Sequence, residues 1–130
     1  MSNFVNLPEV FRSMETDPST ANDPIKRMFL TDGQFITTNV SIIEDSGNTL
    51  HTQAEHDEIV VIFDGEADFR VGEETRHVQA GDMIFIPRNT LHGPLIPQGG
   101  KLSLLSVFSP FFDRTKKNIE WDRDTKREGR

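Results

Sequence analysis

Two histidines, a glutamine and a glutamate have the types and spacing of metal ligands. His51 and Gln53 are two residues apart, Glu58 follows them, and His92 comes from a distant part of the chain. Imidazole suits Zn, Cu, Fe and Ni, whereas carboxylate and amide oxygens suit harder ions such as Mn. Two histidines and one carboxylate with open positions are typical of non-haem iron centres. The four residues therefore predict a divalent-metal site.

Strand alternation predicts which of these side chains face inward. Residues two apart on a strand share a face, so His51 and Gln53 should point the same way. Glu58 shares its face with Val60 and Ile62, and this mostly apolar parity predicts that the face lies in the core. A carboxylate on a buried face is unfavourable unless a cation or hydrogen-bond donors accompany it.

The other two histidines are expected to lie outside the site. His56 has the parity of Glu58 and is an alternative ligand to Gln53, but its acidic neighbours favour a solvated turn at the rim. His77 lies in a polar alternating segment with no motif around it, so we expect it to be exposed on a strand.

Short apolar runs separated by Gly, Asn and Asp turn residues predict the elements that position these groups. Many short strands at this spacing are typical of an all-β barrel or sandwich rather than of βαβ units. The expected strands are Ile25–Leu30, Gln34–Ile43, Leu50–Gln53, Glu58–Phe63, Ala67–Val71, Glu74–Val78, Met83–Ile86, Gly93–Ile96 and Leu102–Ser109.

The 130 residues suggest one domain in three parts. We expect an N-terminal arm over residues 1–24 with a short helix at Leu7–Met14, a barrel over 25–112, and a charged tail over 113–130. Trp121 is the single tryptophan and is expected to anchor that tail.

Charge and composition exclude several functional classes. The net charge is −7, and the residues before Asp113 carry seven Lys/Arg and sixteen Asp/Glu, or −9. An acidic body argues against nucleic-acid binding, which needs a basic face. Without cysteine the chain can form neither disulfides nor thiolate metal sites. No signal peptide or membrane span is recognisable, so we expect a cytoplasmic protein with no membrane partner.

The chain resembles the cupin superfamily, specifically small single-domain RmlC-like cupins, which are double-stranded β-helices or jelly-roll barrels. The first cupin motif is matched by His51, Glu58 and Gly65, with Gln53 in place of the second histidine. In the second motif Gly81, Pro87 and His92 match, and Asn89 replaces a glycine. The resemblance implies a mononuclear site for a divalent metal (Fe, Mn, Ni or Zn) held by His51, Gln53, Glu58 and His92.

A second resemblance concerns the run Phe108-Ser109-Pro110, which is similar to the last strand of small cupins that open unsaturated uronates. In those proteins an Asp and an Arg flank the Phe, whereas Ser106 and Phe112 stand at these places here. The resemblance therefore implies that Ser106 and Phe108 line the substrate pocket, but it does not predict uronate chemistry.

The preferred hypothesis is a homodimeric enzyme that acts on a small oxygenated molecule, such as an organic acid, a phenolic or a sugar derivative. Its metal would serve in oxygenase or in isomerase and lyase chemistry, and Glu58 would ligate it or move a proton. The alternative is a barrel that binds or senses a small ligand without turnover, having weakened or lost its metal. A regulator that docks a partner through its tail is the third possibility.

Overall fold

The computed structural model describes residues 3–44, 47–48, 50–113, 115–116 and 119–121. Within this part of the chain, no helix is long and apolar enough to span a membrane. The elements are α1 (Leu7–Thr16), a short 3-10 helix η1 (Pro18–Thr20), β1 (Ile25–Asp32), β2 (Thr37–Glu44), β3 (Gly47–Asn48), β4 (His51–Thr52), β5 (Asp57–Val71), β6 (Glu74–Gln79), β7 (Met83–Ile86), β8 (His92–Ile96), β9 (Lys101–Ser109) and β10 (Glu120–Trp121).

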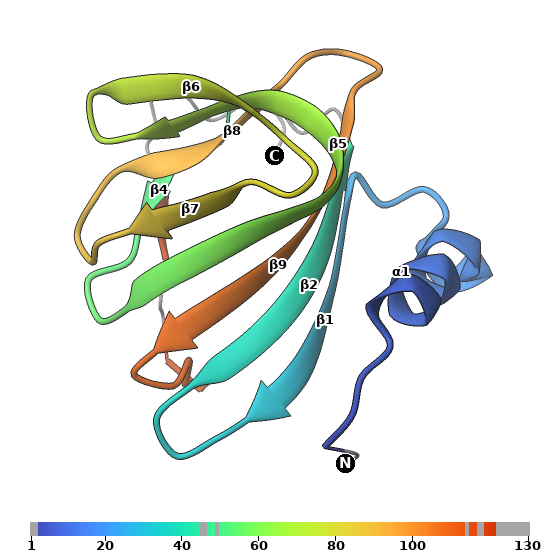
Figure 1. Ribbon diagram of the computed structural model, residues 1–130, viewed down its shortest axis with the longest axis horizontal. Coiled ribbons are helices and arrows are strands. Elements are labelled where there is room, and N and C mark those ends of the chain that lie inside the picture. Colours follow the sequence, from blue (N-terminus) through green and yellow to red (C-terminus); the bar gives the residue numbers. More distant parts are fainter. Residues whose placement is uncertain (1–2, 45–46, 49, 114, 117–118, 122–130) are drawn as a thin grey trace.

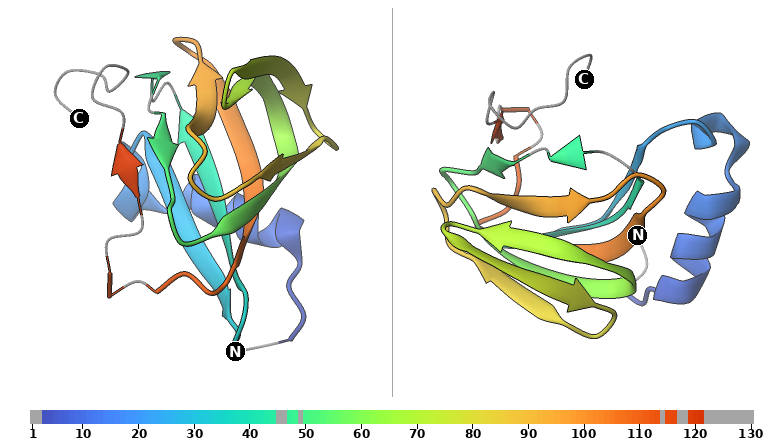
Figure 2. Two further views of the ribbon diagram at one scale, coloured as in Figure 1. Left: turned by 90° about the vertical axis from the view of Figure 1, so that its left-hand side faces the viewer. Right: turned by 90° about the horizontal axis from the view of Figure 1, so that it is seen from above.

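The strands pair in antiparallel fashion and curl into a jelly-roll barrel, as the sequence predicts (Figures 1 and 2). The strand order is β1-β2-β9-β5-β8-β4-β10, with β3 on β8, and β6 and β7 on β5. The first half of β5 pairs with β9 and β7, whereas its second half pairs with β8 and β6. Strand β5 therefore belongs to both walls of the barrel.

The predicted break between two strands at Asp64-Gly65 is wrong, because β5 continues through it. Gly65 has a φ of +88°, and the register with β9 shifts between Ile62 and Asp64. This irregularity bends the strand from one wall to the other instead of ending it. Gly65 also lies against the backbone of β9, where a Cβ would come within 2.3 Å of the Lys101 carbonyl oxygen. A glycine is required here for both reasons.

The inward face of β5 has the predicted alternation. Glu58, Val60 and Ile62 are buried, with 6%, 2% and 1% of their surface exposed, while Ile59 is exposed. Val60 and Ile62 join the main core between the two walls. The sequence pattern thus correctly predicts that Glu58 faces the interior.

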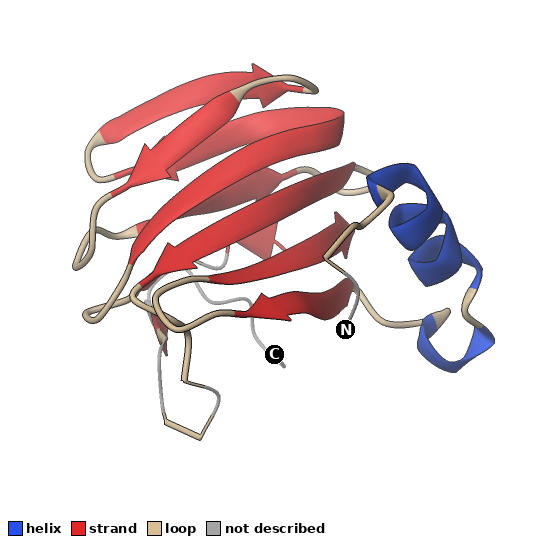
Figure 3. Ribbon diagram, turned by 60° about the horizontal axis from the view of Figure 1, so that its bottom comes forward, coloured by secondary structure: helices blue, strands red, loops and turns tan. Residues whose placement is uncertain are grey.

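Helix α1 covers the outer face of one wall (Figure 3). Its N-cap is Asn6, whose side chain accepts a hydrogen bond from the Glu9 amide, and Pro8 fits in the first turn. Phe11 and Met14 are buried one turn apart, and the Phe11 ring stacks on Phe63 of β5 at 4.4 Å between centroids. The helix runs two residues beyond its predicted end. Its buried residues pack on Val40 and Ile42 of β2.

Several other predicted bounds change. Strand β2 begins at Thr37, three residues later than expected, because a turn closed by the Gly33 amide and the Ile36 carbonyl occupies the preceding residues. The short strands β3 and β10 were not predicted. Strand β10 pairs with β4, so the backbone at Trp121 lies beside His51. The rest of the predicted tail, from residue 122, lies outside the described residues.

Candidate metal and ligand site

A cavity of about 60 Å³ opens between the two walls of the barrel. All four predicted metal ligands line it, and so do the two predicted pocket residues. The lining residues are Arg27, Asn39, Ser41, Ile43, His51, Gln53, Glu58, Val60, Phe69, His92, Pro94, Leu104, Ser106, Phe108, Phe112 and Ile119.

His51 and His92 face each other across two neighbouring strands. Their Cα atoms are register partners between β4 and β8, and their ring centroids are 4.3 Å apart with an angle of 56° between the planes. His92 is 3% exposed. The turn that leads to His92 contains Asn89 at a φ of +63°, so asparagine takes the positive φ of the glycine that it replaces. Two residues 41 positions apart in the sequence are therefore brought together by strand pairing.

The hydrogen bond from His92 to the Thr90 carbonyl shows which ring nitrogen is the acceptor. Nδ1 lies 2.8 Å from the Thr90 carbonyl oxygen and must donate to it, because a carbonyl only accepts. Nε2 then carries the lone pair of the neutral ring. It lies 3.3 Å from Glu58 Oε1 but makes no hydrogen bond there. A carboxylate oxygen and an imidazole lone pair thus face each other, an arrangement that a cation or a proton would relieve.

Gln53 adds a further unsatisfied acceptor to the same place. Its side chain is buried, and Nε2 donates to Glu58 Oε1 at 3.4 Å, while Oε1 has no donor. An unsatisfied buried acceptor costs about 1–3 kcal/mol. A cation between Gln53, Glu58 and His92 would satisfy these acceptors together. The chemistry of the donor set therefore fits a divalent metal.

The four candidate ligands do not have the geometry of a metal site in the arrangement observed. Among the residues that the structure describes, no three His, Asp or Glu side chains form a group ready to hold a metal ion. In the arrangement observed, Gln53 turns its amide nitrogen toward Glu58. Metal binding would accordingly require side-chain movements, including a turn of the Gln53 amide that exchanges its nitrogen for its oxygen.

The expectation that His56 lies solvated at the rim is wrong. His56 is 3% exposed and stacks on Phe112 at 5.1 Å between ring centroids. Its Nε2 donates to the Phe111 carbonyl at 3.2 Å, so the ring attaches the segment after β9 to the barrel. His56 does not line the cavity. Its surroundings favour a structural role over that of an alternative ligand.

Sequence reasoning missed Arg27 and Asn39, which line the cavity from β1 and β2. No motif marks them, but strand parity offered a signal, since polar Asn39 and Ser41 alternate with apolar Val40 and Ile42 in β2. Arg27 is exposed overall, yet desolvation lowers the pKa of its guanidinium, and the charge of Glu58 partly offsets this. Arg27 therefore stands near the interior with its positive charge directed at the same cavity as Glu58.

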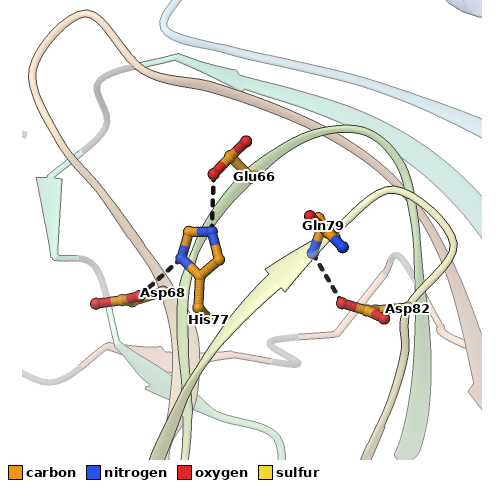
Figure 4. A network of polar contacts seen from close by, with 5 residues as sticks. All are labelled: Glu66, Asp68, His77, Gln79 and Asp82. Atoms are coloured by element: carbon orange, nitrogen blue, oxygen red, sulfur yellow. Dashed lines mark hydrogen bonds and ion pairs between the residues drawn. The ribbon is translucent and has the colours of Figure 1, made fainter.

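His77 is exposed as predicted, but it has two acidic partners that the sequence did not suggest (Figure 4). Nδ1 lies 3.1 Å from Asp68 and Nε2 lies 2.9 Å from Glu66. These carboxylates raise the pKa of His77, with the hydrogen bond to Asp68 as the largest cause. In Figure 4 the nearby Asp82 carboxylate accepts from the Gln79 amide and takes no part in this contact.

The raised pKa of His77 predicts a small pH-dependent stabilisation. A raised folded-state pKa contributes stability that is fully present below the unfolded value, about 6.5, and is lost as pH rises through the folded value. An NMR titration should give a His77 pKa above that of an unfolded peptide, and Asp68→Asn should lower it. A His77 pKa that Asp68→Asn leaves unchanged would contradict the assigned cause.

Comparison with known proteins agrees with this fold. Residues 40–108 match the family model described as "Cupin domain", a segment that includes all four candidate ligands. No curated protein matches the sequence.

Solved structures share the fold at low identity. A protein with a double-stranded β-helix domain from Klebsiella pneumoniae is 17% identical, with a TM-score of 0.69 over 95% of this chain and 99% of that one. KdgF from Halomonas sp. is 22% identical, with a TM-score of 0.64 over 73% and 88%. Pac13 from Streptomyces, described as a nucleoside dehydratase and also solved with uridine, is 16% identical, with a TM-score of 0.64 over 77% and 79%.

Proposed function

Since the chain belongs to the cupin family, we propose that it is an enzyme that binds one divalent metal through His51, Gln53, Glu58 and His92. Its substrate is a small oxygenated organic molecule. One observation carries the proposal: two buried acceptors, His92 Nε2 and Gln53 Oε1, surround the Glu58 carboxylate without a donor of their own. The Thr90 carbonyl supports it further, since metal-ligating histidines usually donate their second nitrogen to such an acceptor.

A bound divalent metal would supply Lewis acidity or redox chemistry toward substrate oxygens. Imidazole, carboxylate and amide ligands together are compatible with Fe, Mn, Ni or Zn. The protein itself excludes water with Val60, Phe69 and Phe108 and orients His92 through Thr90. Glu58 is the group that can hold or move a proton at its Oε1, because it is the one carboxylate among the described residues that line the cavity.

The rival function is a metal-free barrel that binds a small ligand without turnover. The absence of a ready ligand group among the described residues favours it. In that state the 3.3 Å contact between Glu58 and His92 would be an ion pair with a protonated imidazole. Pac13 with uridine supports small-ligand binding by this fold under either function. We also propose a homodimer; Phe111 is available at the surface for its interface, whereas Phe112 packs on Phe108.

Metal titration distinguishes the two functions. Metal-stripped protein titrated calorimetrically with Mn²⁺, Ni²⁺ and Zn²⁺ should bind one equivalent of at least one of them. Stoichiometric ligand binding by protein that takes up none of the three metals would support the metal-free barrel.

A further inference from the structure

The cavity has a second polar end, formed by the inner face of β1, β2 and β9. Arg27 is the register partner of Ser41, and Asn39 is the partner of Ser106. All four side chains line the cavity. Ser106 is also the register partner of Val60 on β5, two residues from Glu58. This polar wall therefore adjoins the candidate metal ligands within one small pocket.

Two of the polar side chains at this end, Asn39 and Ser106, have no protein partner among the described residues. Asn39 and Ser106 are each 3% exposed, and neither side chain makes a hydrogen bond to any residue that the structure describes. Their polar atoms are not fully enclosed, unlike Gln53 Oε1, His56 Nδ1 and His92 Nε2, so they reach the open space of the cavity. Both side chains can therefore form hydrogen bonds with the contents of the cavity.

Arg27 places a positive charge at this end, and no carboxylate of the described residues forms an ion pair with it. Its Nε donates to Ser41 Oγ at 3.3 Å, and it makes no ion pair within the described part of the chain. A guanidinium has five N–H donors, so the remaining N–H groups are available to a ligand. The charge and the unpartnered donors of Asn39 and Ser106 together call for an anion.

We infer that Arg27, Asn39 and Ser106 form a carboxylate subsite, so that the substrate of the proposed enzyme is a small organic acid. A carboxylate matches the planar fork of arginine in a bidentate contact. Arg27 is the one cation among the described lining residues, which is too little charge for a phosphate dianion. The cavity of about 60 Å³ is also small, since a cavity of about 150 Å³ holds benzene.

The inference rests on the proposed function only for the other end of the ligand. With its carboxylate at Arg27, such an acid would direct a hydroxyl or carbonyl oxygen toward Glu58 and His92. The carboxylate subsite itself depends on no metal. Its test can therefore fail or succeed separately from the test of metal binding.

The test uses ω-hydroxy acids of two to four carbons (glycolate, 3-hydroxypropionate and 4-hydroxybutyrate) and their neutral amides as probes. Calorimetry or ligand-observed NMR on the full chain, with and without metal, should give at least one acid that binds about tenfold or more tightly than its amide. Arg27→Gln should abolish that preference, Arg27→Lys should restore part of it, and Ser106→Ala should weaken acid binding a few-fold.

Arg76→Gln is the matched control, because Arg76 is an exposed strand arginine paired with Glu74 and does not line this cavity. It should leave acid binding unchanged. Equal binding of acids and amides by the wild type, or equal acid binding by wild type and a folded Arg27→Gln, would overturn the inference. Acid binding that depends on Arg27 in protein that takes up no metal would uphold the subsite and refute the metal site.

Discussion

Replacing His92 by Ala is expected to weaken the binding of Mn²⁺, Ni²⁺ or Zn²⁺ by at least about 100-fold. Loss of a residue that merely orients a metal ligand costs 10–100-fold in affinity, so loss of a ligand should cost no less. The change also removes the imidazole that faces Glu58 at 3.3 Å and leaves that carboxylate without its neighbour. Calorimetric titration of metal-stripped wild type and variant measures the difference.

The control is His77→Ala. His77 has carboxylates on both sides, as a metal ligand could have, but it lies on the outer surface of the β5–β6 hairpin. Its replacement should leave the affinity of the cavity within about twofold of the wild type, because sites without shared partners behave independently. If His77→Ala, and not His92→Ala, removed the binding, the metal would belong to the surface cluster.

Replacing Gly65 by Ala is expected to lower the free energy of unfolding by more than about 3 kcal/mol. Left-handed backbone costs an L-residue roughly 1–2 kcal/mol, and Gly65 has a φ of +88°. The new Cβ would also lie 2.3 Å from the Lys101 carbonyl oxygen, a backbone atom held in the β5–β9 pairing. The bend in β5 would have to open, which would move Glu58 relative to the opposite wall. Urea unfolding measures the loss.

Gly81→Ala separates the two causes. Gly81 has a φ of +96°, but a Cβ built there meets no atom within 4 Å. This variant should lose only the conformational part, about 1–2 kcal/mol. Equal losses at the two glycines would mean that contact with Lys101 contributes nothing to the requirement for glycine at Gly65.

Local pattern and the family resemblance were together sufficient for the inward-facing ligands. Alternation placed Glu58 with Val60 and Ile62, and the match of Gly81, Pro87 and His92 to the second cupin motif implied that His92 joins the same site. Both depend on contacts near in sequence, or on a turn whose backbone demands are visible in residue type. The same is true of the bounds of β7, which are as predicted.

What the sequence did not predict depends on contacts between distant segments. His56 looks solvated among acidic neighbours, yet Phe111 and Phe112 bury it from 55 residues away. Glu66, Asp68 and His77 meet only because β5 and β6 form a hairpin in a particular register. Arg27 reaches the cavity because β1 is the outermost strand of its wall, which no local pattern reveals. Asp64-Gly65 has turn residues, but the strand bends there because β9 continues to pair with it.

Anomalous diffraction from crystals grown with Zn²⁺ tests the central claim most directly. We expect one strong peak inside the barrel, within about 2.0–2.2 Å of nitrogen atoms of His51 and His92 and of oxygen atoms of Gln53 and Glu58. The Gln53 amide should be turned relative to the arrangement described above. A cavity without a peak, with zinc instead between His77, Asp68 and Glu66, would contradict the account.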